Sequence, residues 1–385
     1  MAKRKLQLAI DPGYDQFKIT LKFDNTVAFF SFPSTIIRTN GSHEGLGKRA
    51  GNFYFYPGDG RIYLFGEAAE NALRSSDTVN ANRDLLEINK SSERFQSIYF
   101  KFALEAAIAQ CLYLFQKSEE GEESGFSRED LEEYSITIGI ALPHDALKDD
   151  RTTVLEYIRS KHEFKFQVAG DMSEPEECHY DFSKIGVGAN SQAVCAFLSF
   201  ALSDNATTLE GVYHHLPCVV YDAGYRTVGR FAIDTNLDIS RGESNTDFAM
   251  YNVYQLVASK VNEQISSRTF EPYRVQKYLQ DNMTVNADQK RIDLQPLYDE
   301  SLKEVCQEAW NELNKNWKNA LEDSRTFLLA GGTGDAYFKT FKREMATNYP
   351  YIDLILANKD FCGKKIEPIF AISVGLMKFL HLHIN

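Results

Sequence analysis

The sequence predicts an α/β protein with a duplicated plan, and three observations favour this fold class. Residues 8–14 (Leu-Ala-Ile-Asp-Pro-Gly-Tyr) and residues 219–225 (Val-Val-Tyr-Asp-Ala-Gly-Tyr) are near-copies of one pattern, with one copy in each half of the chain. Each copy is followed by a second alternating stretch, which is typical of a β-hairpin. Strands alternate with helical patterns after each hairpin, as they do in α/β domains.

The composition indicates a globular protein of ordinary hydrophobicity. The chain has 385 residues, of which 43% are hydrophobic and 25% charged, enough for two or three domains with sizeable cores. Its formal net charge of −12 argues against broad nucleic-acid binding through its own surface, because phosphate neutralisation needs a basic face. The six cysteines form no C-x-x-C pair, and we expect a reduced, cytoplasmic setting.

The sequence gives no sign of a membrane or secretory segment. No stretch reaches the roughly 18 uninterrupted apolar residues of a membrane helix. The basic residues 3–5 are followed by a strand pattern that leads directly to Asp11, with no cleavable apolar region between them. We therefore expect no membrane partner and no secretory signal.

The first half should contain a hairpin with a third strand, a small subdomain, and then helices around one buried strand. Glycines and aromatic residues crowd the subdomain, and its aromatic clusters at 53–56 and 63–65 belong either to its core or to a subunit contact, with the contact favoured. In order, we predict strands over 6–32, the subdomain at about 33–90, a helix over 92–117, a surface loop over 118–128, a strand over 136–143 and a helix near 150–161.

The second half should repeat the hairpin and then alternate helices with a strand. An apolar helix is expected before it, and a helix-like run closes the chain. In order, we predict a helix over about 188–203, the hairpin from residue 219, helices over 246–266, 271–280 and 299–321, a strand from residue 327 that enters a glycine turn and a helix, and a helix over 370–380.

The two hairpins have the chemistry of a polyphosphate site. A turn glycine lets a ligand approach the main chain, and turn amides can point together toward an anion. Asp11 and Asp222 end the two first strands, where carboxylates could anchor a hydrated magnesium ion. Lys18 and Thr227 on the return strands could contact phosphates. Aspartate and glycine are also common in ordinary hairpin turns, but the pairing of two such turns favours the phosphate site.

A third glycine cluster, Gly331-Gly332-Thr333-Gly334, lies between a strand and a helix. Such a junction lets the backbone approach a base or sugar, and helix amides favour anions. It lacks the Gly-Lys-Ser/Thr of a Walker loop and the G-x-G-x-x-G of a dinucleotide fingerprint.

Taken in order, these motifs resemble those of the actin, heat-shock protein and sugar-kinase superfamily. D-x-G-x-x-x-x-K from Asp11, D-x-G-x-x-T from Asp222 and A-G-G-x-G from Ala330 are similar to its phosphate-one, phosphate-two and adenosine segments. Within it, the first hairpin looks most like that of the plasmid-segregating, ParM-type (StbA-like) bacterial actins and their archaeal relatives. Residues 139–143 and 370–376 resemble their G-L-P strand end and closing helix.

The resemblance implies two ribonuclease-H-like, actin-like ATPase domains flanking a nucleotide cleft, with a small inserted subdomain. Domain I would be residues 1–183 plus 365–385, and domain II residues 184–364. The matching site residues are Asp11, Gly13, Tyr14 and Lys18 in the first hairpin, Asp222, Gly224, Tyr225, Arg226 and Thr227 in the second, and Gly331, Gly332, Thr333 and Gly334 in the adenosine loop. Residues 241–244, Lys260 and Glu263 occupy the region that usually meets the purine and ribose.

The chain departs from the family pattern at the residue that orients the attacking water. Ile185 stands where a polar residue would precede the helix start at 186–189. Gln192 resembles the actin pattern instead and is our preferred catalytic residue, together with Asp11 and Asp222. Alternatively, Gln192 only covers polar surface on an amphipathic helix, and Lys184, Ser183 or another residue orients the water.

The resemblance implies a Mg²⁺-dependent ATPase, or one that uses GTP, which forms homopolymeric filaments. Its expected role is plasmid DNA segregation through a DNA-binding adaptor protein. Two other functions stay open. A small-molecule kinase of the same superfamily would need a base aspartate beside a substrate pocket, and no clear sugar-kinase signature occurs. A non-polymerising, nucleotide-switched scaffold commonly carries an amphipathic tail, for which residues 381–385 are poorly suited.

Overall fold

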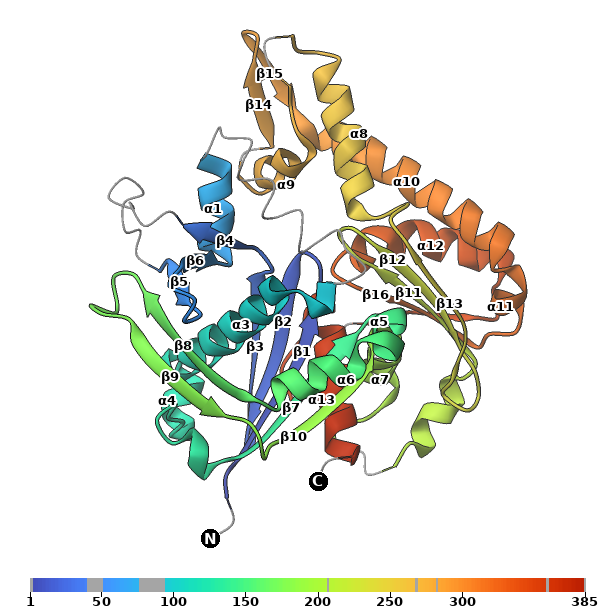
Figure 1. Ribbon diagram of the computed structural model, residues 1–385. Helices are drawn as coiled ribbons and strands as arrows, with labels where there is room; N and C mark the ends of the chain where they lie inside the picture. Colours follow the sequence, from blue (N-terminus) through green and yellow to red (C-terminus); the bar gives the residue numbers. More distant parts are fainter. Residues whose placement is uncertain are drawn as a thin grey trace. The chain divides into compact units, whose positions relative to one another are not determined.

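The computed structural model describes residues 3–39, 51–75, 94–205, 208–266, 269–281, 283–357 and 360–383. The chain divides into two compact units (Figure 1). The first comprises Met1–Cys195, Asp204–Thr207 and Ile372–Asn385, and the second comprises Ala196–Ser203 and Thr208–Ala371. The first unit extends past the predicted domain boundary at residue 183, because the strand that follows it belongs to the first unit's sheet.

The central sheet of the first unit has the strand order β10-β7-β1-β2-β3. The strands β1, β2 and β3 form an antiparallel meander, and β7 and β10 extend the sheet in parallel from β1. Every residue of β1 after Lys5 is buried, as expected for a strand covered on both faces. The bounds are β1 Lys5–Pro12, β2 Gln16–Phe23, β3 Thr26–Pro33, β7 Ser135–Leu142 and β10 Gly186–Ser191.

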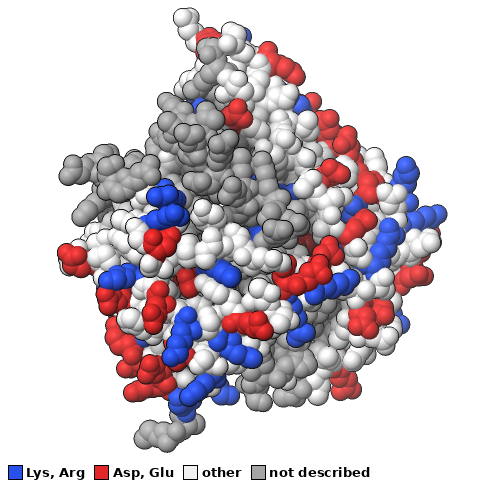
Figure 2. Space-filling view, viewed as in Figure 1, with Lys and Arg blue, Asp and Glu red and all other residues white. Residues whose placement is uncertain are grey.

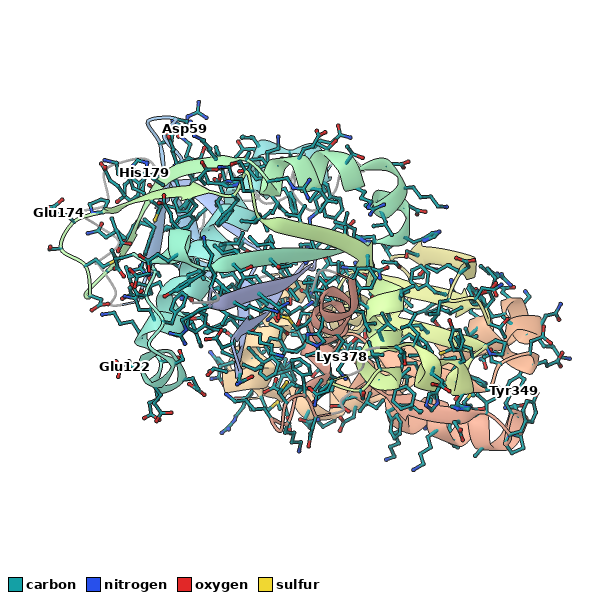
Figure 3. All side chains as sticks on the ribbon, turned by 90° about the horizontal axis from the view of Figure 1, so that it is seen from below. Asp59, Glu122, Glu174, His179, Tyr349 and Lys378 are labelled. Carbon is teal, nitrogen blue, oxygen red and sulfur yellow. The ribbon has the colours of Figure 1, made fainter. Side chains whose placement is uncertain are left out.

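Two helices cover the two faces of this sheet. On one face, Phe100 of α3 (Ile98–Lys117) stacks on Phe17 of β2, with ring centroids 6.2 Å apart. On the other, the Ser373 hydroxyl of α13 (Ala371–His383) lies 2.8 Å from the Thr20 hydroxyl of β2. The same helix carries Lys378 (Figure 3), a buried lysine whose ammonium pairs with an Asp204 carboxylate oxygen at 3.2 Å.

A second sheet in the first unit has the order β4-β6-β5-β8-β9. Its last two strands come from residues 161–181, so the subdomain predicted at about 33–90 is completed by a later segment that the sequence analysis did not predict as strands. The bounds are β4 Ile36–Thr39, β5 Phe53–Tyr56, β6 Ile62–Phe65, β8 Lys161–Val168 and β9 Glu176–Asp181. The helix α1 spans Glu67–Ser75. Residues 40–50 and 76–93 of the predicted subdomain lie outside the described residues.

The aromatic clusters of the subdomain pack inward, so the favoured prediction of a subunit contact is wrong for most of them. Phe53, Phe55, Tyr63 and Phe65 are each at most 1% exposed. The rings of Phe53, Phe55 and Tyr63 meet rings of α3 or β8, and Phe55 lies 6.0 Å from Phe102. The Phe65 ring packs against Phe17 of the first sheet at 6.3 Å.

The helix α3 lies between the two sheets, which explains its composition. Phe100 and Phe115 contact the first sheet, whereas Phe102 and Tyr113 contact the second. A helix buried on both sides needs apolar residues all round. Among the described residues it is the one helix long and apolar enough to cross a membrane, and 61% of its most apolar window is buried in the molecule.

Three predicted elements need correction. The stretch 118–128 contains a short helix, α4 (Glu119–Ser124), because the Ser118 hydroxyl caps its first turn and Gly125 ends it at φ 63°. The helix expected near 150–161 is α5 (His144–Asp149) followed by α6 (Arg151–Ile158). The helix predicted over 188–203 is the strand β10 followed by α7 (Gln192–Ala201), since residues 186–191 pair in parallel with β7.

The second unit repeats the plan of the first. Its sheet has the order β13-β12-β11-β16-β17, in which β11, β12 and β13 form the antiparallel meander and β16 and β17 extend it in parallel. This is the strand order of the first unit's central sheet, and it confirms the predicted duplicated α/β fold. The bounds are β11 Cys218–Ala223, β12 Val228–Ile233, β13 Ile239–Asn245, β16 Thr326–Ala330 and β17 Asp353–Leu356.

Helices and a small hairpin complete the second unit. A core of buried aromatic residues, including Tyr221, Trp310 and Phe341, joins the sheet to the helices α10 and α12. A second core joins α8, α9 and the hairpin β14–β15. The bounds are α8 Met250–Asn262, α9 Pro272–Asp281, β14 Thr284–Ala287, β15 Lys290–Asp293, α10 Leu294–Asn316, α11 Lys318–Glu322 and α12 Gly334–Asn348.

Candidate functional site

The first hairpin holds a buried carboxylate between two donors. Asp11 faces Lys18 across β1 and β2, and the lysine ammonium lies 3.4 Å from Asp11 Oδ2. On the other side, Gln192 Nε2 donates a hydrogen bond of 2.8 Å to Asp11 Oδ1. Asp11 is only 1% exposed, and a buried charge needs such partners. The structure therefore brings together three of the predicted site residues in the first unit.

Gln192 owes its position to the junction between β10 and α7. It is the first residue of α7, directly after the strand that pairs with β7. Its contact with Asp11 argues against the alternative in which it only covers polar surface. The other candidates, Ser183 and Lys184, are exposed, and the Ser183 hydroxyl donates to Asp181.

The turn of the first hairpin has little free space at Gly13. A Cβ there would lie 2.7 Å from Lys18 Nζ and 2.8 Å from the Gln16 carbonyl oxygen. The Gly13 carbonyl accepts hydrogen bonds from the Ser34 hydroxyl at 2.8 Å and from Arg94 Nη2 at 2.7 Å. The Arg94 guanidinium also lies over the Tyr14 ring, 4.5 Å from its centroid. The sequence analysis missed Ser34 and Arg94, since nothing local marks contacts with Gly13 from 21 and 81 positions away.

The two strands of the second hairpin pair in the same antiparallel way as those of the first, but different residues surround its turn. The Gly224 N–H donates to the Thr227 carbonyl at 2.9 Å and closes the turn. The Tyr225 ring packs against Tyr251 of α8 at 6.0 Å, and the Arg226 guanidinium lies 4.9 Å from the centre of the Tyr251 ring.

The predicted adenosine loop lies directly against this second hairpin. Gly331 has φ 84°, and a Cβ there would lie 2.3 Å from the Ala223 carbonyl oxygen and 2.5 Å from Asp222 Oδ1. The Thr333 hydroxyl and its N–H both donate to that Ala223 carbonyl, at 2.6 Å and 3.1 Å. Gly332 follows Gly331 in the turn, and Gly334 begins α12. The structure thus brings the predicted glycine loop together with Asp222.

Lys260 and Glu263 lie at the far end of α8 from the second hairpin. The start of this helix contacts the hairpin through Met250, whose N–H donates to the Gly224 carbonyl at 3.3 Å. Lys260 is ten residues further along, about 15 Å at helical rise. Its ammonium pairs with Glu300 at 3.1 Å and Glu304 at 3.7 Å. The structure does not bring these residues to the turn, and their contact with a base stays a prediction.

The segment 241–244 belongs to β13 and packs against the end of α10. The Arg241 guanidinium lies 4.2 Å from the centre of the Trp317 ring. Glu243 accepts a hydrogen bond of 2.6 Å from the Trp317 indole and pairs with the buried Arg230 at 3.0 Å. The contacts described for these two side chains are therefore with neighbouring residues of the fold.

The two hairpins offer hard oxygen donors of the kind that Mg²⁺ prefers. In the described part of the chain, no group of three or more His, Cys, Asp or Glu side chains forms a ready metal cage. Magnesium usually keeps several waters and needs only one or two carboxylates beside the phosphates of a nucleotide. Within its own unit, each hairpin supplies one such carboxylate near the end of its first strand, Asp11 in the first unit and Asp222 in the second.

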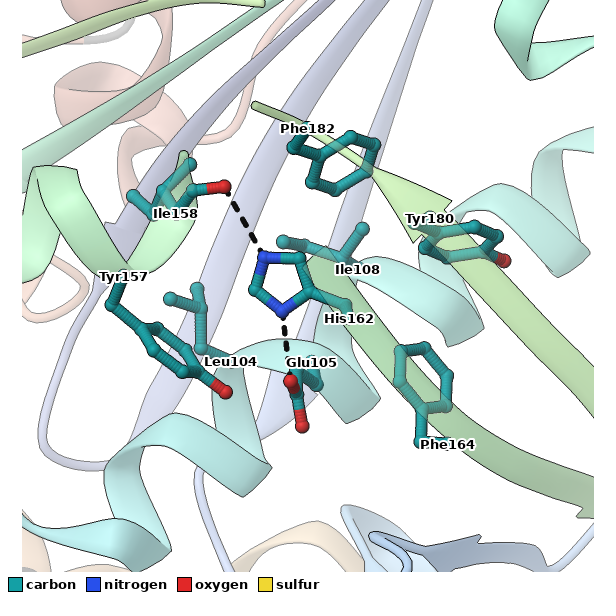
Figure 4. A pocket seen from close by; sticks show the side chains of 9 residues that line it. All are labelled: Leu104, Glu105, Ile108, Tyr157, Ile158, His162, Phe164, Tyr180 and Phe182. Atoms are coloured by element: carbon teal, nitrogen blue, oxygen red, sulfur yellow. Dashed lines mark hydrogen bonds and ion pairs between the residues drawn. The ribbon is translucent and has the colours of Figure 1, made fainter. Parts of the chain in front are cut away.

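A further buried polar cluster lies inside the first unit (Figure 4). The two ring nitrogens of His162 face Glu105 Oε1 at 2.8 Å and the Ile158 carbonyl oxygen at 3.2 Å. Burial raises the pKa of the neighbouring Tyr157, and Glu105 raises it further. The surrounding cavity measures about 10 Å³, which holds no more than a single water. This cluster therefore supports the packing of β8 on α3 and offers no ligand site.

Comparisons with known proteins support the same fold. Residues 220–342 match the family model of the archaeal actin homologue MreB-like, C-terminal. No curated protein matches the sequence.

Solved structures match along almost the whole chain. A 15-stranded ParM filament from Clostridium botulinum is 15% identical, with a TM-score of 0.65 over 97% of this chain and 98% of that one. A non-polymerisable mutant of pCBH ParM is 16% identical, with a TM-score of 0.64 over 97% and 98%. The archaeal actin homologue Ta0583 in complex with ADP is 15% identical, with a TM-score of 0.62 over 96% and 97%. Together these comparisons confirm the prediction from the motifs that the chain has an actin-like fold similar to that of ParM proteins and archaeal actin homologues.

Proposed function

We propose that this protein binds and hydrolyses ATP, or GTP, with Mg²⁺ and couples the reaction to its own polymerisation. The observation that carries the proposal is the buried Asp11 carboxylate held between Lys18 and Gln192 at the turn of the first hairpin. The second hairpin repeats the pattern with Asp222 and the Gly331 loop. The ADP complex of the similar protein Ta0583 supports a nucleotide as the ligand.

The residues divide the work of phosphoryl transfer to water, which is mostly positioning and charge stabilisation. The turn amides after Asp11 and Asp222 and the Lys18 ammonium bind the phosphates. Gln192 orients the attacking water, and the residues 331–334 bind the adenosine. When bound, Mg²⁺ would neutralise charge on the phosphate oxygens. Asp11 and Asp222 would hold it, through its water shell.

Filament formation is the proposed consequence of nucleotide binding. The similar structures include a ParM filament, and a head-to-tail contact that does not close generates an open polymer. On the face in Figure 2, acidic and basic side chains are interspersed among the described residues. Because the chain has a net charge of −12, we propose that DNA is bound through an adaptor protein. We also propose that the cargo is a plasmid and that the setting is cytoplasmic.

The test is polymerisation of the purified protein with ATP and Mg²⁺, followed by light scattering and by pelleting. We expect sedimenting polymer and phosphate release at tens of micromolar protein, and neither from the Asp222→Ala variant. Absence of polymer with the unmodified protein would remove the filament function. Release of ADP only when a sugar is added would instead identify a kinase.

A further inference from the structure

Arg94 is a buried cation that the proposed mechanism does not use. It is 2% exposed and contacts the rings of Tyr14, Phe95 and Phe100 at 4.5, 5.4 and 5.7 Å. Burial lowers the pKa of its guanidinium to about 10, despite the nearby Tyr14 and Asp11. Within the described residues it has no ion pair, and its Nε has no hydrogen-bond partner. A buried charge is costly unless it is paired, and since no carboxylate of the described residues pairs with Arg94, their packing alone gives no reason for an arginine here.

The hydrogen bond that Arg94 makes among the described residues fixes the orientation of a turn peptide. Arg94 Nη2 and the Ser34 hydroxyl both donate to the Gly13 carbonyl. In a trans peptide the following N–H, here that of Tyr14, points away from the carbonyl. Holding the Gly13 oxygen on one side therefore directs the Tyr14 N–H to the other. That N–H makes no hydrogen bond within the described part of the chain.

We infer that Arg94 is a positioning residue, which presents the Tyr14 N–H to a phosphate group of the bound nucleotide. The inference rests on the proposed function and assigns a further residue to the same site. A guanidinium suits this role because it is planar: one edge donates to the Gly13 oxygen while its face stacks on Tyr14. Its charge also adds to the positive field that favours an anion at the turn.

The experiment compares Arg94→Met and Arg94→Lys with Arg128→Met. Arg128 is a matched control, because its side chain is 7% exposed, lies over two aromatic rings at 5.3 Å and pairs with Glu176 away from the hairpin. Binding of ADP and of adenosine is measured by isothermal titration with Mg²⁺, on variants shown to be folded by circular dichroism. Arg94→Met should weaken ADP binding about tenfold, the effect of losing one charge-assisted hydrogen bond, and leave adenosine binding unchanged. Arg94→Lys should fall between, and Arg128→Met should bind ADP normally.

Each other outcome has a distinct meaning. Unchanged ADP binding by folded Arg94→Met, or an equal loss for ADP and adenosine, would overturn the positioning role. If Arg94→Met does not fold, Arg94→Lys and Ser34→Ala decide: both act on the same Gly13 carbonyl, and unchanged ADP binding in both overturns the role. If the unmodified protein does not bind ADP, the same titrations are made with GDP and guanosine; failure to bind either diphosphate would remove the proposed function itself, and this inference with it.

Discussion

The two hairpins share one pattern and one place in the sheet, yet different forces hold them. The first is held by side chains from distant parts of its unit: Arg94 and Ser34 on the Gly13 carbonyl, and Gln192 on the Asp11 carboxylate. The second is held by close backbone packing, with Gly331 against Ala223 and the Thr333 hydroxyl on the Ala223 carbonyl. Charged and amide side chains thus stabilise the first hairpin, whereas steric fit of the backbone stabilises the second.

In each sheet, one strand pairs in parallel with the first strand of the hairpin. The difference between the two hairpins follows from the residues that come after this parallel strand. In the first unit, β7 ends at Leu142 and Pro143 follows, a residue with a fixed φ that cannot adopt the positive φ of a glycine turn. In the second, β16 ends at Ala330 and Gly331 follows, whose positive φ lets the loop fold onto β11. The asymmetry predicts that the second hairpin is vulnerable to added volume, whereas the first is vulnerable to lost polar groups.

The largest expected effect is the substitution of Gly331 by alanine. The new Cβ would overlap the Ala223 carbonyl and the Asp222 carboxylate at 2.3 and 2.5 Å, at a backbone φ of 84°. Strain of this kind costs about 3 kcal/mol of folding free energy. Chemical unfolding monitored by circular dichroism measures it.

The control for this variant is Gly211→Ala in the same unit. A Cβ at Gly211 meets nothing within 4 Å, so the free energy of unfolding should change by less than about 0.5 kcal/mol. Equal effects of the two substitutions would show that the second hairpin does not depend on steric fit at Gly331.

The next largest effect concerns Gln192 of the first unit. Gln192→Ala should lower the rate of nucleotide hydrolysis about a hundredfold, because positioning of a nucleophile contributes on that scale. Nucleotide affinity should stay within about threefold, since the phosphate-binding amides remain. Steady-state phosphate release and equilibrium nucleotide titration separate the two quantities.

Lys184→Ala is the matched control, because Lys184 is the exposed alternative for orienting the water. It should hydrolyse nucleotide normally. A large loss in Lys184→Ala with normal turnover in Gln192→Ala would transfer the role to the lysine.

Much of this arrangement could be predicted from the sequence, because its signals are local. The two Asp-x-Gly hairpins, the duplicated α/β plan and the long apolar helix α3 follow from alternation, turn glycines and helical spacing. The strand β8 carries such a signal too, since residues 163–168 alternate polar with apolar residues, but the sequence analysis did not use it. The helix predicted from 188 failed because a short strand runs directly into an apolar helix, where periodicity does not mark the boundary.

The supporting contacts could not be predicted in the same way. Arg94 reaches Gly13 across 81 positions and Gln192 reaches Asp11 across 181, and neither pair has a spacing rule. The resemblance to a known family suggested Gln192, but it gave no indication of Arg94. Long-range partners of a turn depend on tertiary packing, which a single sequence does not encode in any local pattern.

A smaller effect is expected when one neutral hydrogen bond is removed from either of the two turns. Thr333→Val removes the hydroxyl donor to Ala223 and leaves the Thr333 N–H on the same carbonyl. We expect a loss of about 1 kcal/mol in the free energy of unfolding, measured by urea denaturation. Ser34→Ala, which leaves Arg94 on Gly13, should cost a similar amount. A much larger loss for Ser34→Ala would mean that Arg94 alone cannot hold its turn.

The smallest effect is expected at the second turn of each antiparallel meander, between β2 and β3 and between β12 and β13, and it depends on pH. Asp24 accepts from the Lys5 N–H at 2.9 Å and pairs with Arg4 at 2.7 Å. Burial tends to raise its pKa, but the Lys5 N–H and Arg4 together hold it below the ordinary value of 3.8. Its stabilising contribution is therefore fully present above pH 3.8 and is lost as the pH falls through the lowered native pKa.

Asp24→Asn should thus cost about 0.5 kcal/mol at pH 7, a small amount because both side chains are partly exposed and screened by solvent. The difference from the unmodified protein should vanish at the acid end of a stability–pH profile. Asp234 occupies the equivalent turn of the second unit, and in the described part of the chain it accepts only from backbone N–H groups of its own turn, at 2.8 and 3.0 Å. Because an asparagine oxygen can still accept both bonds, Asp234→Asn should be close to neutral at every pH. An equal, pH-dependent loss in both variants would mean that the ion pair with Arg4 is not the cause of the pH-dependent stabilisation at Asp24.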